Sequence, residues 1–353
     1  MSRQDNHLAL HLAAAFTVLV VYASLHPFLG WRDLGAPPLA WLETGWLRYT
    51  TRTDIFFNVA AYLPFGFLWV AVLQNRLHRL LAIVIVFVCG ALLSALIETV
   101  QNYLPTRVPS NLDFLGNTLG TLIGAIVGAF WGGTLLTGGR IDALRERTVI
   151  PGFTGDSGLV LVGLWLLTQV NPESLLFGNG DLRRLLGIET TVAFDVERFG
   201  HIEGAIAAVN ALAIGLIMAA LRFKPYVVLF VLLAGMAIRA LAAAILVEPA
   251  EALRWVTTGN MTGAAIGCLL LLPTLRLLRV LQRSVAAVAL LLATILVNLA
   301  PQNPYLADAV LVWKQGHFLN FNGLTRLLSM LWPFLALAWL LIPQRDPWKD
   351  TET

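Results

Sequence analysis

Acidic, basic and amide side chains gather in one stretch of an otherwise apolar sequence, and they are the groups that could do chemistry. Glu98 and Gln101 are three residues apart, so both lie on one face of a helix. Asp113 and Asn117 are four residues apart and share a helix face in the same way. Arg107 lies between the two pairs, so a helical hairpin would bring all of them together. With an amide from an upstream helix, the predicted ligand-binding site comprises Asn58, Glu98, Gln101, Arg107, Asp113 and Asn117.

The carboxylate of Glu98 needs a partner in a membrane. A carboxylate deep in a bilayer costs at least about 2.5–3.5 kcal/mol on insertion scales, and Arg107 is the nearest cation in the sequence. Two interpretations stay open: a Glu–Arg clamp that fixes the hairpin, and a polar pocket that binds a ligand. We favour the pocket, because an ionisable residue within a membrane marks a functional site by default.

The composition predicts a polytopic membrane protein. The 353 residues are 58% hydrophobic and 13% charged, with a mean hydropathy of +0.74, whereas a soluble domain carries about 25% charged residues. The net charge is +3 and the basic residues are scattered, so no nucleic-acid partner is expected. Cys89 and Cys268 both lie in apolar runs and do not imply a disulfide. No metal or cofactor is expected.

Ten apolar segments are long enough to cross a bilayer, which takes about 20 residues of helix. Helices are the expected form, because backbone polar groups find no partners in lipid. The predicted class is therefore an all-α helix bundle. The expected spans are 8–28, 54–74, 80–103, 113–136, 157–171, 201–221, 226–247, 256–273, 285–301 and 324–342.

Lysine and arginine residues predict the orientation, since cytoplasmic loops carry the excess of them. The two termini and the loops after the second, fourth, sixth and eighth spans hold 13 in short stretches. The opposite loops hold nine in much longer stretches. Both termini are therefore expected in the cytoplasm, after an uncleaved first helix, with the connection 104–112 facing outward. The long outward loops 29–53, 172–200 and 302–323 read either as amphipathic or re-entrant pieces or as ordinary surface loops.

An internal repeat relates two parts of the chain. The segment LGNTLGTLIGAIVG, 115–128, parallels TGNMTGAAIGCLLL, 258–271, with its glycines displaced by 143 residues. Asn58 falls near Glu203 at an offset of 145. The repeating unit holds four helices, and an even number restores the orientation, so the repeat is parallel. The predicted domains are 1–140, a diverged second copy at 141–280, and two further helices with a cytoplasmic tail at 281–353.

Glycine recurs at every fourth residue from Gly116 to Gly128. Such a stripe lets a neighbouring helix approach closely, so a packing role is expected. In the helix that carries Asn58, Pro64 interrupts the hydrogen-bond ladder and frees a carbonyl. The resulting kink could turn Asn58 and Tyr62 toward the hairpin.

The second copy keeps the packing glycines but not the carboxylate of the first. Position 98 maps to Leu241 or Ala243, depending on the offset. Arg239 lies in the apolar middle of its segment, and Glu203 lies near the start of another. We expect these two residues to pair or to line a shared cavity; a local ion pair without further role is the alternative. The second copy would then support a single site in the first.

The motifs resemble those of the VanZ-like family of bacterial membrane proteins. The matching segments are FNVAAYLPFGFL, 57–68, and ALIETVQNYLPTRVPSNLDFLGNTLGTLIG, 95–124, within a resemblance that covers about residues 10–136. Thr106 follows Pro105 where the family more often has glycine. The resemblance implies a bacterial inner-membrane location and a link to teicoplanin resistance. The matching residues are Asn58, Pro64, Phe65, Gly66, Glu98, Gln101, Pro105, Arg107, Asp113, Asn117, Thr118 and Gly120.

Three functions fit these observations. In the favoured one, the pocket binds a polar or anionic lipid-linked group at the outer leaflet, with Arg107 and a helix N-terminus holding phosphate. Asp113 opposes an anion there, and a cation that bridges Asp113, Glu98 and phosphate would resolve the conflict. An enzyme acting on a lipid-linked envelope precursor is the second function, with Glu98 or Asp113 as general base; its catalytic residues are unknown. A transporter or flippase, favoured by the parallel repeat, is the third.

Overall fold

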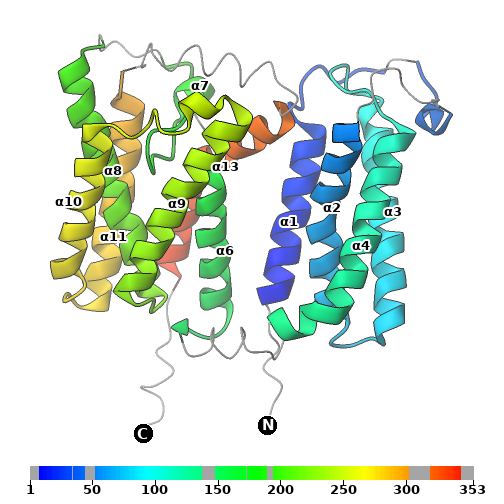
Figure 1. Ribbon diagram of the computed structural model, residues 1–353, viewed down its shortest axis with the longest axis horizontal. Helices are drawn as coiled ribbons and strands as arrows, with labels where there is room; N and C mark the ends of the chain where they lie inside the picture. Colours follow the sequence, from blue (N-terminus) through cyan, green and yellow to red (C-terminus); the bar gives the residue numbers. More distant parts are fainter. Residues whose placement is uncertain are drawn as a thin grey trace, which may run out of the picture. The chain divides into compact units, whose positions relative to one another are not determined.

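The described residues are helical. Figure 1 shows the computed structural model, in which long helices run beside one another within each part of the chain. None of the described residues belongs to a strand, so the predicted all-α class is confirmed. The structure describes residues 8–33, 35–43, 52–136, 148–171, 173–188, 194–301 and 319–342.

The chain divides into two compact units, Met1–Arg147 (unit 1) and Thr148–Thr353 (unit 2). The helices of unit 1 are α1 (Leu8–Leu25), α2 (Arg52–Leu73), α3 (Arg79–Gln101) and α4 (Asn111–Leu136). Those of unit 2 are α6 (Phe153–Thr168), α7 (Arg183–Leu186), α8 (Val196–Ala220), α9 (Pro225–Leu246), α10 (Thr258–Thr274), α11 (Arg279–Leu299) and α13 (Leu319–Leu341).

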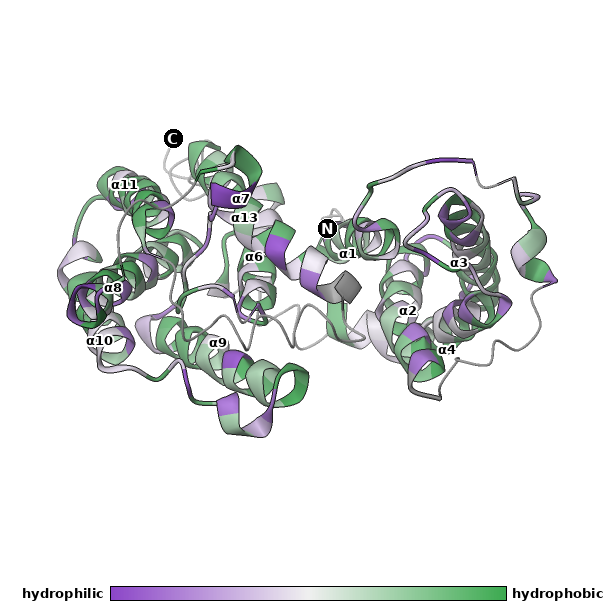
Figure 2. Ribbon diagram, turned by 90° about the horizontal axis from the view of Figure 1, so that it is seen from above, coloured by the Kyte–Doolittle hydropathy of each residue, from purple (hydrophilic) through white to green (hydrophobic). Residues whose placement is uncertain are grey.

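Each of the ten predicted spans overlaps one long helix. Of the helices that the structure describes, eight are long and apolar enough to cross a membrane; α6 is apolar but has only 16 residues, and α10 has 17. Hydrophobic residues (green in Figure 2) predominate along the long helices. The protein is therefore a multi-pass helical membrane protein.

The outer face of α3 shows how these helices meet lipid. Leu80, Val84, Val88, Leu92 and Leu96 are all exposed. Residues four apart lie on the same face of a helix, so the five form one continuous apolar stripe. Such a stripe is suited to lipid tails and would be a liability in water.

Helices α2 and α4 pack backbone to backbone at the glycine stripe. A Cβ atom on Gly120 would lie 2.3 Å from the carbonyl oxygen of Val59, and one on Gly124 would lie 2.0 Å from that of Leu63. No side-chain atom approaches a carbonyl that closely, so only glycine permits this spacing. The predicted packing role of the stripe is confirmed.

Helices α8 and α10 of unit 2 meet in the same way. A Cβ atom on Gly263 would lie 2.1 Å from the carbonyl oxygen of Gly204, and one on Gly267 would lie 2.4 Å from that of Ala208. Compared with unit 1, the glycines are displaced by 143 residues and their partners by 145. This common register is what the predicted repeat requires of two copies.

The two further helices pack within unit 2, α11 against α8 and α13 against α6. Two tryptophans of α13 form hydrogen bonds to α6. Nε1 of Trp332 donates to the carbonyl oxygen of Leu161 (2.9 Å), and Nε1 of Trp339 donates to that of Thr154 (3.0 Å). The three-domain division of the chain stays a prediction, because packing alone does not define how the parts arose.

Two of the long loops that are predicted to face outward fold onto their units. In 29–53, a short 3-10 helix, Ala40–Leu42, buries Trp41. In 172–200, Leu176 and Phe177 are fully buried in the core of unit 2. Both pieces therefore carry apolar anchors that dip into the helix bundle. The third loop, 302–323, lies almost wholly outside the described residues.

Candidate functional site

The carboxylate of Glu98 holds the start of α4. Glu98 lies near the end of α3 and is only 2% exposed. Its Oε2 accepts a hydrogen bond from the backbone N–H of Ser110 (2.9 Å), and the hydroxyl oxygen of Ser110 accepts one from the N–H of Leu112 (3.1 Å). The first N–H groups of a helix lack partners within the helix, so these bonds cap α4. Ser110 thus caps the N-terminus of α4.

Gln101 and Arg107 bind the end of α1. Nε2 of Gln101 donates to the carbonyl oxygen of Ser24 (2.9 Å). Arg107 donates to the carbonyl oxygens of Ala23 (3.2 Å) and His26. The last carbonyls of a helix carry partial negative charge and lack intrahelical partners, so an arginine is favourable there.

The guanidinium of Arg107 contacts no carboxylate among the described residues. Its guanidinium binds backbone carbonyls, and no described carboxylate forms an ion pair with it. Its Nε is buried without a hydrogen-bond partner. Burial lowers the pKa of Arg107, and the charge of nearby Glu98 opposes that shift. The predicted Glu–Arg clamp therefore takes another form: both residues fix helix ends, and they do not bind each other.

Asn58 and Asp113 join α2 to α4. Nδ2 of Asn58 donates to Oδ1 of Asp113 at 2.7 Å. Gly116 sits beside this pair, because a Cβ on it would lie 3.0 Å from the Cβ of Asn58. The close helix contact therefore continues up to the polar pair. The expectation that Asn58 turns toward the hairpin is confirmed.

Asn117 lies deeper and faces α3. Its Nδ2 donates to the hydroxyl oxygen of Ser94 (3.0 Å), and both side chains are buried. Tyr62 is buried near Ser94 and Glu98. Sequence reasoning had missed Ser94, which falls in an apolar run with no spacing that marks it.

A segment between α1 and α2 covers the polar end of the hairpin. Trp41 is 2% exposed; its Nε1 donates to the hydroxyl oxygen of Thr99 (3.1 Å), and its ring lies 5.4 Å from that of Phe114. Nδ2 of Asn102 donates to the carbonyl oxygen of Pro38 (2.7 Å). The sequence leaves this segment as either an amphipathic or re-entrant piece or an ordinary surface loop, and it gives no signal for these partners.

The six predicted residues thus lie toward one end of unit 1 and make four connections. Glu98 joins α3 to the start of α4, and Asn117 joins α4 to α3 at a deeper level. Gln101 and Arg107 bind the end of α1, and Asn58 and Asp113 join α2 to α4. Among the residues described, no group of three or more His, Cys, Asp or Glu side chains is placed to hold a metal ion. The arrangement offers a guanidinium near the buried carboxylate of Glu98, with the partly buried carboxylate of Asp113 near Glu98, and these are groups that could bind a polar ligand.

Comparison with known proteins agrees with this architecture. A family model described as VanZ/LLP1 matches residues 4–132, which span α1 to most of α4. No curated protein and no solved structure was found to match the chain. The protein is thus a multi-pass helical membrane protein. Its N-terminal part, residues 4–132, is similar to the VanZ/LLP1 family.

Proposed function

We propose that this membrane protein binds the anionic part of a lipid-linked group of the bacterial envelope at the outward end of unit 1. The observation that supports the proposal is the guanidinium of Arg107, which is half-buried at the end of the helices and contacts no carboxylate of the described residues. A charge removed from water without an opposite charge is costly. A phosphate oxygen at Arg107 would supply that charge, and arginine is well suited to phosphate.

The two acidic residues of the site are engaged by neutral donors. Glu98 accepts from Ser110 and Asp113 accepts from Asn58, so each carboxylate has part of its hydrogen-bonding capacity met within the protein. Their charges still oppose an anion, as the sequence indicated. A cation that bridges the carboxylates and the phosphate remains part of the proposal.

Binding of a polyprenyl phosphate to the full-length protein in nanodiscs tests the proposal, with native mass spectrometry as the readout. Arg107→Ala should weaken binding at least about tenfold, since a hydrogen bond to a charged group contributes about 1.5–3 kcal/mol. Arg107→Lys should retain part of the affinity, because it keeps the charge without the planar fork.

Arg32→Ala is the matched control. Arg32 is exposed, and its backbone N–H binds the carbonyl oxygen of Tyr103, so it lies at the same end of unit 1. The control should bind as the wild type does. Undiminished binding by a folded Arg107→Ala variant would contradict the proposal, and thermal unfolding of each variant establishes that it is folded.

The VanZ-like region extends the proposal to glycopeptide susceptibility. Expression of the protein in a susceptible bacterial host should raise the concentration of teicoplanin that inhibits growth. Arg107→Ala should abolish the increase at equal membrane levels of protein, whereas Arg32→Ala should not. An increase that survives Arg107→Ala would separate resistance from the polar site.

A further inference from the structure

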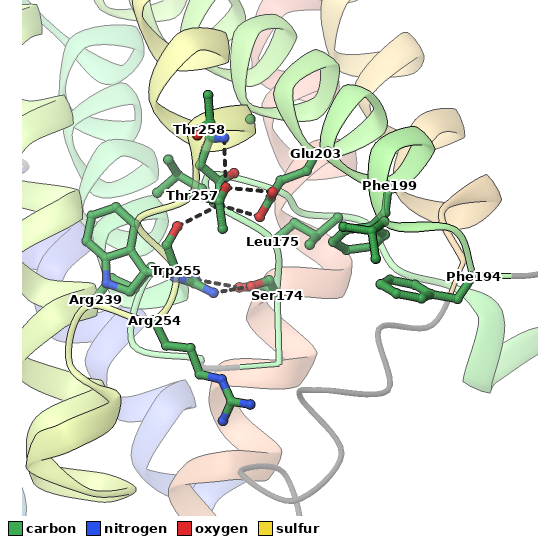
Figure 3. A pocket seen from close by; sticks show the side chains of 15 residues that line it. Ser174, Leu175, Phe194, Phe199, Glu203, Arg239, Arg254, Trp255, Thr257 and Thr258 are labelled. Carbon is green, nitrogen blue, oxygen red and sulfur yellow. Dashed lines mark hydrogen bonds between the residues drawn. The ribbon is translucent and has the colours of Figure 1, made fainter.

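A cavity of about 380 Å³ lies in unit 2, and none of the residues of the proposed site lines it. It opens between the segment 174–176, the first turns of α8, the helix α9 and the start of α10. Figure 3 shows Phe194 and Phe199 side by side at one end and Trp255 on another wall. The two phenylalanine rings lie 5.2 Å apart. The cavity therefore has aromatic walls, and its size is typical of a small-molecule site.

A buried carboxylate lines this cavity. Glu203 is 6% exposed and accepts from the hydroxyl of Thr257 (2.6 Å) and from Nδ2 of Asn260 (2.5 Å). Both donors are neutral. Asn260 also lines the cavity, is 1% exposed, and has an Oδ1 atom without a hydrogen-bond partner. Two acceptors, one of them a carboxylate, thus lie together with no cation of the described residues in hydrogen-bond contact.

A buried cation lines the same cavity. Arg239 is 6% exposed, and it donates to Asn171 and to the hydroxyl (3.2 Å) and carbonyl oxygens of Ser174. No described carboxylate forms an ion pair with Arg239, although the charge of Glu203 is near enough to act on it. The expectation that Glu203 and Arg239 line a shared cavity is confirmed.

The other arginine of the cavity is already neutralised. Arg254 binds Glu251 at 2.7 Å. Among the lining residues, the negative charge of Glu203 and the positive charge of Arg239 therefore remain without a partner of opposite charge in contact. The two charges lie at separate places in the wall of one cavity.

We propose that this cavity binds a small zwitterionic group. Its ammonium would donate to Glu203 and to the free Oδ1 of Asn260, and its anionic oxygens would accept from Arg239. Its carbon skeleton would lie against the aromatic walls. A lone anion would meet Glu203 and a lone cation would meet Arg239, whereas a neutral ligand would leave both charges without a partner. The ethanolamine phosphate of a membrane lipid and a free amino acid share this chemistry.

Calorimetry on the full-length protein in nanodiscs of phosphatidylglycerol tests the inference, with phosphoethanolamine and L-alanine as zwitterionic probes. Glycerol phosphate and ethanolamine carry only one of the two charges. A zwitterion should bind at least about tenfold more tightly than either, because a charge-assisted hydrogen bond is roughly twice as strong as a neutral one. Glu203→Gln keeps a side chain that can bind Thr257 but removes the charge, so it should lose at least about tenfold in affinity.

Glu197→Gln is the matched control, since Glu197 is exposed on the first turn of the same helix. It should bind as the wild type does. Nanodiscs of phosphatidylethanolamine distinguish the two sources: loss of soluble-probe binding there identifies a lipid headgroup, and unchanged binding identifies a free zwitterion. Absence of zwitterion binding to the wild type would overturn the inference. So would equal binding by a folded Glu203→Gln variant.

Discussion

The backbone N–H of Ser110 is buried, and its partner is the carboxylate of Glu98 on another helix. The Glu98–Ser110 bond is therefore one of the ties between the end of α3 and the start of α4. A buried donor left without an acceptor costs about 1–3 kcal/mol. Glu98 therefore has a structural role in addition to any contact with a ligand.

Glu98→Ala should lower the stability of the protein by about 1–3 kcal/mol for this reason. Glu98→Gln should cost less, because its carbonyl oxygen can still accept from Ser110. The measurement is unfolding of the purified protein in detergent. Glu43→Ala removes an exposed carboxylate from unit 1 and should leave stability nearly unchanged. Equal stability of Glu98→Ala and the control would show that the tie is dispensable.

Helical spacing predicts which end of the unit these side chains occupy, but not the partners that they choose. Glu98 and Gln101 share a face, as their spacing requires, yet one binds the start of α4 and the other binds the end of α1. Those partners are backbone groups. Every residue has them, so nothing in the sequence marks which carbonyl or N–H will be reached.

At the scale of the elements, the glycines of α4 set the distance to α2. Gly124→Ala should lower stability by about 1–3 kcal/mol, the usual cost of overpacking, because the new methyl group would meet the carbonyl of Leu63. Gly263→Ala in α10 should behave alike, since it would meet the carbonyl of Gly204. Unfolding in detergent measures both.

Gly163→Ala is the control for these variants. Gly163 lies within α6 with nothing within 4 Å of a Cβ atom, so alanine fits there. Alanine in a helix is more favourable than glycine by about 0.5–1 kcal/mol, so this variant should gain stability. A gain of stability in all three variants would mean that helix propensity, rather than close contact, governs the effect.

Apolar runs predict the existence of the long helices well and their ends poorly. The predicted span 285–301 corresponds to α11, which begins at Arg279, and the span 157–171 corresponds to α6, which begins at Phe153. Hydropathy identifies the stretch that suits lipid. A helix extends further wherever polar residues can continue its hydrogen bonds, and arginine and glutamine do so readily.

At the scale of the whole molecule, orientation in the membrane is open to a direct test. We propose that the connection between α3 and α4 faces outward and that both termini are cytoplasmic. In a variant without the native cysteines, Thr106→Cys should react with a membrane-impermeant maleimide in intact cells, because Thr106 is exposed in that connection.

Asn75→Cys tests the opposite side of the membrane in the same experiment. Asn75 is exposed in the turn between α2 and α3, on the opposite side of unit 1. It should react only after the membrane is permeabilised. The reverse pattern would place Arg107 on the cytoplasmic side, and the polar site would then face lipid groups of the inner leaflet.

The contact of α2 with α4 also bears on how unit 1 could admit a ligand. Two packed helices slide past each other through small rearrangements of the side chains between them. At the glycine stripe almost no side chains lie between α2 and α4. Helices α2 and α4 are therefore expected to move as one rigid pair. Helix α1 is held at its end by polar bonds from Gln101 and Arg107, which can break and re-form. Entry to the site is consequently expected beside the end of α1, because opening there would break these hydrogen bonds and leave the close contact of α2 with α4 intact.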